Sequence, residues 1–149
     1  MEERKEYHFY GWQNAVCEPI NKAYAAIHTP IDLYEKLTKV WCAETCAPRL
    51  RKEYNNEHVT CGQCSITAFL VQDIFGGEVR GVLRPGGNYH CFNVVDGKNF
   101  DLTSEQFGDE VLDYTNCEVQ QREVHFAKAE KYERYQLLTK KLNAYLEHL

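Results

Sequence analysis

The chain has 149 residues, the length of one domain that can bury a single hydrophobic core. Hydrophobic residues make up 44% of the sequence and charged residues 26%, values that are ordinary for a soluble globular protein. The net charge of −5 argues against a dedicated nucleic-acid-binding protein, which needs a basic stripe to neutralise phosphates, so we expect no nucleic-acid partner.

The amino-terminal third contains one well-marked helix start. Residues 1–10 are charged and are expected to be frayed, and the segment 19–28 favours a short helix between two prolines. Thr29 can then cap a longer helix, with Pro30 at its first position and Asp32 completing a pair that resembles a capping box. Apolar residues at helical spacing predict that this helix continues to near Pro48: Leu33, Leu37, Val40 and Trp41.

The segment 62–75 predicts a second, buried helix. Its apolar face is broad and includes Ile66, Phe69 and Ile74. Two consecutive glycines, Gly76 and Gly77, follow as a strong helix terminator.

Three strands are predicted after this helix, within residues 78–103. Residues 78–83 and 89–95 suit strands, and the Pro-Gly-Gly-Asn sequence between them suits a turn. Asp96-Gly97 is the sequence signal of a two-residue hairpin, after which residues 99–103 return as the third strand. The segment therefore predicts a small antiparallel β-meander.

The carboxy-terminal segment 127–149 predicts a long helix. Its apolar stripe is expected to pack on the domain's own sheet and consists of Tyr135, Leu138, Leu142, Tyr145 and Leu149. Dimerisation through this helix is the alternative, so we expect a monomer or a homodimer. No repeat, low-complexity tract or linker interrupts the chain, and residues 1–149 are predicted to form a single α+β domain.

Seven cysteines are the most unusual feature of the composition. Their number is odd, so they cannot all pair within the chain. The amino terminus has no apolar core of a signal peptide, and the longest apolar runs, such as residues 68–71, are about four residues long. We therefore expect a cytoplasmic protein without a membrane span, in which thiols stay free unless they bind a metal or do chemistry.

Cys64 is the candidate nucleophile. It is predicted to lie in the first turn of the buried helix, where unpaired backbone N–H groups and the helix dipole favour a thiolate. Gln63, directly before it, could donate its amide to a developing oxyanion beside the backbone N–H of Cys64; a surface position at the helix start is the alternative.

His90 and Asp101 are the candidate base and its orienting carboxylate. If Val95 pairs with Lys98 across the Asp96-Gly97 turn, His90 and Asp101 are diagonal neighbours on one face of the hairpin. Their side chains can then meet, whereas a three-residue loop would put them on opposite faces. Cys64, His90 and Asp101 thus fit the roles of nucleophile, base and orienting group.

The chain also resembles a known family. The residues that carry the resemblance are Gly62-Gln63-Cys64, Thr67-Ala68, Gln72-Asp73, Phe75-Gly76-Gly77, His90, Asn93, Gly97, Asp101-Leu102-Thr103 and Gln106-Phe107, with Trp41, Glu44-Thr45 and Arg134-Tyr135 outside them. Together they resemble the YunG-like family of small bacterial proteins, over roughly residues 41–138. This family has no settled activity, so the resemblance implies none for this chain. Its Cys, His and Asp motifs resemble those of papain-like and transglutaminase-like folds, which implies such a fold here, with Cys64, His90 and Asp101 at the site.

These observations favour a thiol-dependent hydrolase or acyl transferase that acts on an amide or peptide-type bond and needs neither a metal nor another cofactor. Three alternatives stay open. Cys42, Cys46, Cys61 and Cys64 have spacings close to those of a structural zinc site. The Cys61-Gly62-Gln63-Cys64 sequence suits a dithiol oxidoreductase. The protein could also keep the fold and use its groove only for binding.

Overall fold

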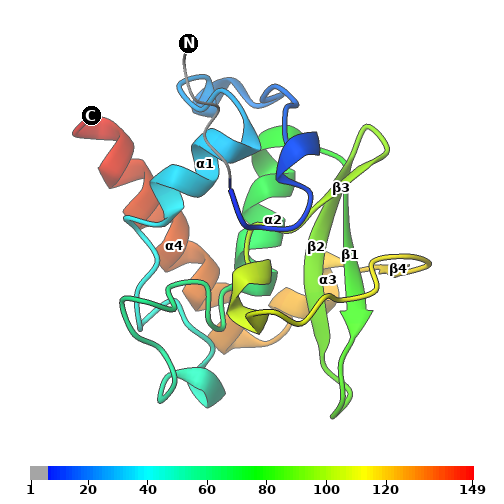
Figure 1. The fold of residues 1–149 in the computed structure, drawn as a ribbon. Helices are drawn as coiled ribbons and strands as arrows, with labels where there is room; N and C mark the ends of the chain where they lie inside the picture. Colours follow the sequence, from blue (N-terminus) through cyan, green and yellow to red (C-terminus); the bar gives the residue numbers. More distant parts are fainter. Residues whose placement is uncertain (1–6) are drawn as a thin grey trace.

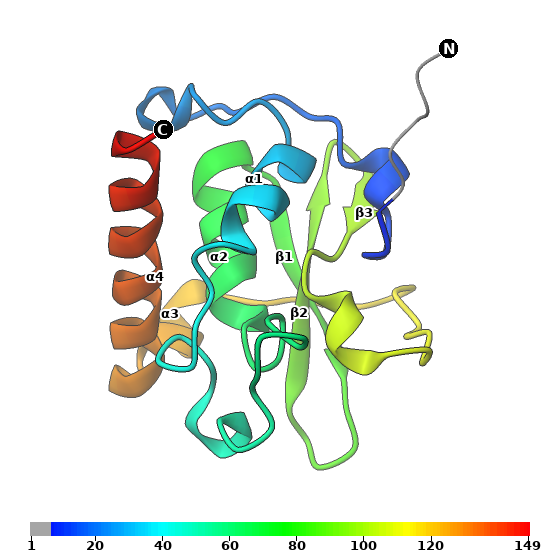
Figure 2. The ribbon, with the colours of Figure 1, turned by 60° about the vertical axis from the view of Figure 1, so that its left-hand side comes forward.

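Helix α2 (Cys64–Phe75) is the central element of the computed structural model, which describes residues 7–149. A small sheet lies on one side of α2, and α1 (Pro30–Leu37) and α4 (Ala129–Glu147) lie on the other (Figure 1). Figure 2 shows α4 running alongside α2. Because α2 is covered on both sides, its apolar residues Ile66, Phe69 and Leu70 are fully buried, as the sequence predicts. The chain has an α+β fold.

The sheet has four antiparallel strands in the order β3-β2-β1-β4. Their bounds are β1 (Glu78–Leu83), β2 (Tyr89–Val95), β3 (Lys98–Phe100) and β4 (Glu118–Val119). Val95 pairs with Lys98, and both residues of the intervening turn have positive φ, 53° at Asp96 and 76° at Gly97. This is the two-residue hairpin that the sequence predicts. The third strand begins one residue earlier than expected and ends at Phe100.

The two faces of the sheet contact different parts of the chain. One face packs on α2, where Cys91 contacts Phe69 and the Asn93 side chain donates to the Ala68 carbonyl at 2.9 Å. The other face is covered by the segment 101–117, and here Phe92 packs against Tyr114. Because side chains alternate along β2, His90 lies on this second face, together with Phe92.

Helix α1 is much shorter than the sequence predicts. Thr29 caps it as expected, since its hydroxyl accepts the Asp32 N–H at 3.2 Å, but the helix ends at Leu37 and not near Pro48. The Thr45 hydroxyl accepts the Cys42 N–H at 3.1 Å and donates to the Cys42 carbonyl at 3.0 Å. Such side-chain bonds to the backbone stabilise a turn in place of a helix. The predicted helix over 19–28 is reduced to a 3₁₀ turn at Lys22–Tyr24.

The long carboxy-terminal helix is confirmed as α4, but its apolar stripe packs differently from the prediction. Leu138 and Leu142 are fully buried against α2 and α1, not against the sheet, because α2 separates α4 from the strands. Leu149 lies beyond the helix and is 72% exposed. A further short helix, α3 (Arg122–Phe126), precedes α4 and was not predicted.

The amino-terminal segment is not frayed throughout. Phe9 is buried in the main core, and Tyr10 forms an isolated antiparallel bridge with Asp101. The expectation of a frayed end is therefore wrong for these two residues, and its first part, residues 1–6, lies outside the described residues. Within residues 7–149, no helix is both long and apolar enough to cross a bilayer.

Candidate active site

Cys64 is the first residue of α2, as the sequence predicts, and it is partly exposed. Gln63 is the N-cap residue, and no side chain caps the helix. The first-turn N–H groups of α2 therefore point toward the region of the thiol, where the helix dipole favours negative charge.

His90 connects Cys64 to Asp101. Its imidazole is near enough to the Cys64 thiol to act on its ionisation, and its Nε2 atom lies 2.6 Å from Asp101 Oδ2. Since Nε2 is occupied by the carboxylate, Nδ1 is the ring nitrogen left for the sulfur. The Phe107 ring meets the imidazole edge-on, with the ring centroids 4.7 Å apart. The three residues singled out in the sequence therefore lie together in one site.

Asp101 is held by further hydrogen bonds. Its Oδ1 atom accepts the Thr103 N–H at 3.1 Å and the Thr103 hydroxyl at 3.3 Å. Its Oδ2 atom accepts the Tyr114 hydroxyl at 2.6 Å in addition to its bond with His90. Tyr114 in turn stacks on Tyr10, whose carbonyl accepts the Asp101 N–H. Neither Tyr114 nor Tyr10 was predicted, because both lie in irregular segments without a periodic pattern.

Charge at the site favours a thiolate–imidazolium pair. Burial raises the pKa of Cys64, but the hydrogen bond and positive charge of His90 and the Cys91 N–H outweigh it and lower this pKa to about 7. Burial lowers the pKa of His90, whereas the charge and hydrogen bond of Asp101, with the Cys64 sulfur, raise it to about 10. Between these values the thiol is deprotonated and the imidazole is protonated.

Gln63 is fully buried and is not a surface residue. Its side-chain N–H₂ donates to the Cys42 carbonyl at 3.1 Å, and its Oε1 has no hydrogen-bond partner within residues 7–149. One of its two donor hydrogens is therefore used within the protein. Its role toward a developing oxyanion stays a prediction.

A second amide, Gln106, connects the turn before Cys64 to the loop that holds Asp101. Its Oε1 accepts the Gly62 N–H at 3.3 Å, and its Nε2 donates to the Thr103 carbonyl at 3.0 Å. Arg134 of α4 supports the same turn, because its guanidinium donates to the carbonyls of Thr45, at 3.0 Å, and Gly62, at 3.4 Å. Sequence reasoning had assigned no role to either side chain.

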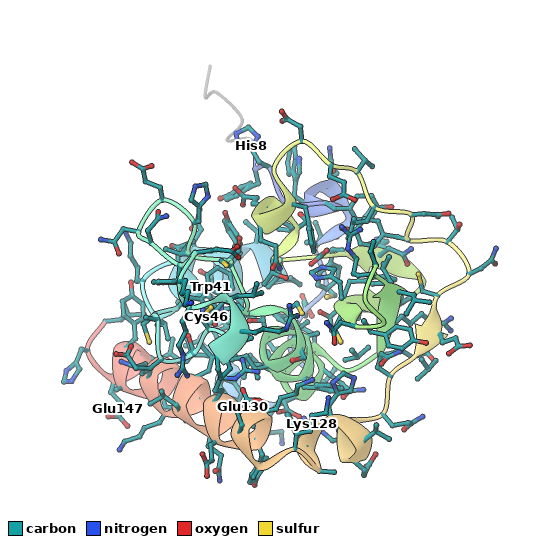
Figure 3. All side chains as sticks on the ribbon, turned by 90° about the horizontal axis from the view of Figure 1, so that it is seen from below. His8, Trp41, Cys46, Lys128, Glu130 and Glu147 are labelled. Atoms are coloured by element: carbon teal, nitrogen blue, oxygen red, sulfur yellow. The ribbon has the colours of Figure 1, made fainter. Side chains whose placement is uncertain are left out.

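The other cysteines lie apart from this arrangement. The Cys46 thiol donates to the Ala47 carbonyl at 3.4 Å and the Cys61 thiol to the Leu50 carbonyl at 3.8 Å, whereas Cys64 is directed to His90. In the part of the chain that the structure describes, no group of three or more His, Cys, Asp or Glu side chains is placed to hold a metal ion. Cys46 and Trp41, both labelled in Figure 3, belong to the connection between α1 and α2.

Comparisons with known proteins give a family but no activity. The model of the YunG protein family matches residues 29–147, which include all three residues of the site. The chain is 40% identical to the uncharacterized protein YunG of Bacillus subtilis (strain 168) over 55 residues, 37% of this chain and 47% of that relative. The chain thus spans about half the length of this relative. No solved structure matches the chain. Because the family model covers most of its length, the chain belongs to the YunG family.

Proposed function

We propose that this protein is a cysteine-dependent hydrolase or acyl transferase that acts on an amide or peptide-type bond. The observation that supports this most is the position of His90, which is hydrogen-bonded to Asp101 and interacts with the Cys64 thiol. A thiol nucleophile that attacks an acyl carbon needs an imidazole as its base and a carboxylate that orients this imidazole, and these groups occur here in that order.

In the proposed reaction the Cys64 thiolate attacks the carbonyl carbon of the substrate and forms a tetrahedral intermediate. The His90 imidazolium then gives its proton to the leaving amine, the C–N bond breaks, and a thioester remains on Cys64. Neutral His90 next takes a proton from water or from an acceptor amine, which attacks the thioester and frees the thiol. Asp101 orients the imidazole throughout. The Cys64 N–H is the candidate donor to the oxyanion, with Gln63 beside it.

We also propose that the fold is related to papain-like and transglutaminase-like folds. The support is the order of the elements, with a cysteine at the start of a buried helix, a histidine on an adjacent antiparallel strand and an aspartate after the next strand. A cytoplasmic location is proposed with it, because all seven cysteines are free and free thiols suit a reducing compartment.

Acetylation by p-nitrophenyl acetate tests this function. The Cys64 sulfur should take the acetyl group and release p-nitrophenolate, giving one acetyl group per chain that hydroxylamine removes. Cys64→Ala should abolish this fast phase and His90→Ala should slow it. Cys117→Ala, which removes a partly exposed thiol outside the site, should leave it unchanged.

The same experiment separates the proposed enzyme from a protein that only binds. Acetyl groups spread over lysines and several cysteines, with no loss of rate in Cys64→Ala, would contradict the proposed nucleophile. A binding protein with an inert thiol would give this result.

A further inference from the structure

We propose that the ammonium group of Lys131 binds a carboxylate of the substrate beside Cys64, so that the enzyme prefers acyl or amide substrates with a negative charge near the reacting carbonyl. This inference rests on the proposed function, because it assigns a substrate class to the same site.

The position of Lys131 follows from its neighbour Arg134. Arg134 donates to the Gly62 carbonyl, so this face of α4 lies beside the turn that leads into Cys64. Lys131 precedes Arg134 by three residues, and residues at this spacing share a helix face. Lys131 is thus placed in the first full turn of α4, next to the start of α2.

Groups from three other elements face the Lys131 ammonium. It donates to Nδ1 of His125 in α3 at 2.9 Å, and the His125 ring in turn packs on Phe69 of α2. The ammonium also interacts electrostatically with Cys91 of β2 and with Cys64 of α2. Lys131 therefore approaches Cys64 from the side of α2 and α4, whereas His90 lies on the face covered by the segment 101–117.

The charge of Lys131 is not balanced by a carboxylate. Among residues 7–149, no Asp or Glu side chain lies within ion-pairing distance of it, and the adjacent Glu130 is paired with Arg134. Its one hydrogen-bond partner is neutral, because burial and the nearby charges of Lys131 and Lys128 lower the pKa of His125 to about 4. An ammonium has three donors, so two are left for a ligand.

A half-buried cation without a carboxylate partner has a desolvation cost that an anionic ligand would offset. Burial lowers the pKa of Lys131, and the Cys91 and Cys64 sulfurs oppose this shift only in part. Both Lys131 and Cys64 are partly exposed, as a ligand that touches both would require. A carboxylate next to the attacked carbonyl satisfies the free donors while the carbonyl carbon meets the sulfur.

Two alkylating reagents of nearly the same size test this proposal. Iodoacetate carries a carboxylate and iodoacetamide is neutral, and both transfer a two-carbon group to the Cys64 thiolate with loss of iodide. The rate constants at Cys64 are divided by those of free glutathione, which removes the intrinsic difference between the reagents. The ratio of the corrected rates, iodoacetate over iodoacetamide, then measures the attraction of Cys64's surroundings for a carboxylate.

Lys131→Met should lower this ratio about fivefold, because one nearby positive charge is lost from a partly desolvated site. Lys128→Met is the matched control. Lys128 is an exposed lysine directly before α4 (Figure 3), and its removal should leave the ratio unchanged. Added salt should lower the ratio in the wild type and have less effect in Lys131→Met.

The outcomes separate this proposal from the proposed function. If Lys131 only supports the thiolate, Lys131→Met slows both reagents equally and the unchanged ratio overturns the carboxylate site. If Cys64 is not an activated nucleophile, both reagents react slowly in the wild type, and the proposed function fails whatever the ratio. An equal fall of the ratio in Lys131→Met and Lys128→Met would indicate a general surface field and would also overturn the site.

Discussion

The His90 Nε2 atom lies 2.6 Å from Asp101 Oδ2, and both side chains are almost inaccessible to solvent, with 2% and 1% exposed. A hydrogen bond this short and this buried fixes the imidazole plane and leaves Nδ1 to face the Cys64 sulfur. It also brings the Asp101 charge close enough to keep the ring protonated. The reactivity of Cys64 thus depends on the Asp101 carboxylate, which is hydrogen-bonded to the imidazole and not to the sulfur.

The first prediction concerns the pH dependence of Cys64. Since His90 lowers the pKa of this thiol to about 7, the iodoacetamide rate should rise with a midpoint near that pH and not near 9. In His90→Ala the thiol is still buried but loses the positive charge beside it, so the midpoint should move above 9. At pH 7 the rate should fall about tenfold, because the higher nucleophilicity of the more basic thiolate offsets part of the lost ionisation. Peptide mapping of the alkylated protein measures this at each cysteine.

A second result of the same mapping serves as the control. Cys17, whose pKa burial raises to about 11, should react slowly in both proteins. Equal rates at all the partly exposed cysteines would contradict the ion pair.

The second prediction concerns Tyr114, whose hydroxyl donates to the Asp101 carboxylate at 2.6 Å. A hydrogen bond to a charged group contributes about 1.5–3 kcal/mol, so Tyr114→Phe should lower the free energy of unfolding by that amount. Tyr54→Phe is the matched control, because its hydroxyl donates to the neutral Trp41 carbonyl at 3.0 Å and should contribute only about 0.5–1.5 kcal/mol. Urea unfolding followed by fluorescence measures both. Equal losses would show that the bond from Tyr114 to Asp101 is no stronger than a bond to a neutral carbonyl.

Much of the site could be predicted because two local signals fix it. A two-residue turn at Asp96-Gly97 sets the register of β2 and β3, and this register puts His90 and Asp101 on one face. The double glycine after Phe75 and the apolar pattern before it define α2. The contact between Cys64 and His90 could not be predicted in this way, because it depends on how α2 packs against β2. No local sequence pattern encodes that packing.

The parts that sequence reasoning missed share a physical cause. Helix α1 was predicted to continue to near Pro48, but a turn stands in part of that stretch, where the Thr45 hydroxyl bonds the Cys42 backbone. Strand β4 has only two residues, too few for an alternating pattern to appear. Tyr10 and Tyr114 come from irregular segments that are far apart in the sequence, and only tertiary structure brings their rings together.

The third prediction concerns zinc, which the spacing of Cys42, Cys46, Cys61 and Cys64 had suggested. The Cys46 and Cys61 thiols donate to the Ala47 and Leu50 carbonyls, while Cys64 is directed to His90, so the four sulfurs do not form one tetrahedral group. The purified protein should therefore contain much less than one zinc per chain by elemental analysis. A chelator should leave the unfolding midpoint unchanged, both in the wild type and in Cys42→Ser. One zinc per chain that is lost in Cys42→Ser would instead establish a metal site and remove Cys64 as a free nucleophile.

The last prediction concerns Gly62, two residues before Cys64. Its φ is +70°, and a Cβ there would lie 2.5 Å from Cys46 Sγ and 2.8 Å from the Ala47 nitrogen. Gly62→Ala should therefore combine backbone strain with overpacking and lower the free energy of unfolding by about 2–5 kcal/mol. Gly97→Ala is the matched control, since its φ is +76° but nothing lies within 4 Å, so about 1–2 kcal/mol is expected. Chemical denaturation measures both. A loss no larger in Gly62→Ala than in Gly97→Ala would mean that the turn before Cys64 can move away from Cys46, and that the position of the nucleophile is not fixed by this contact.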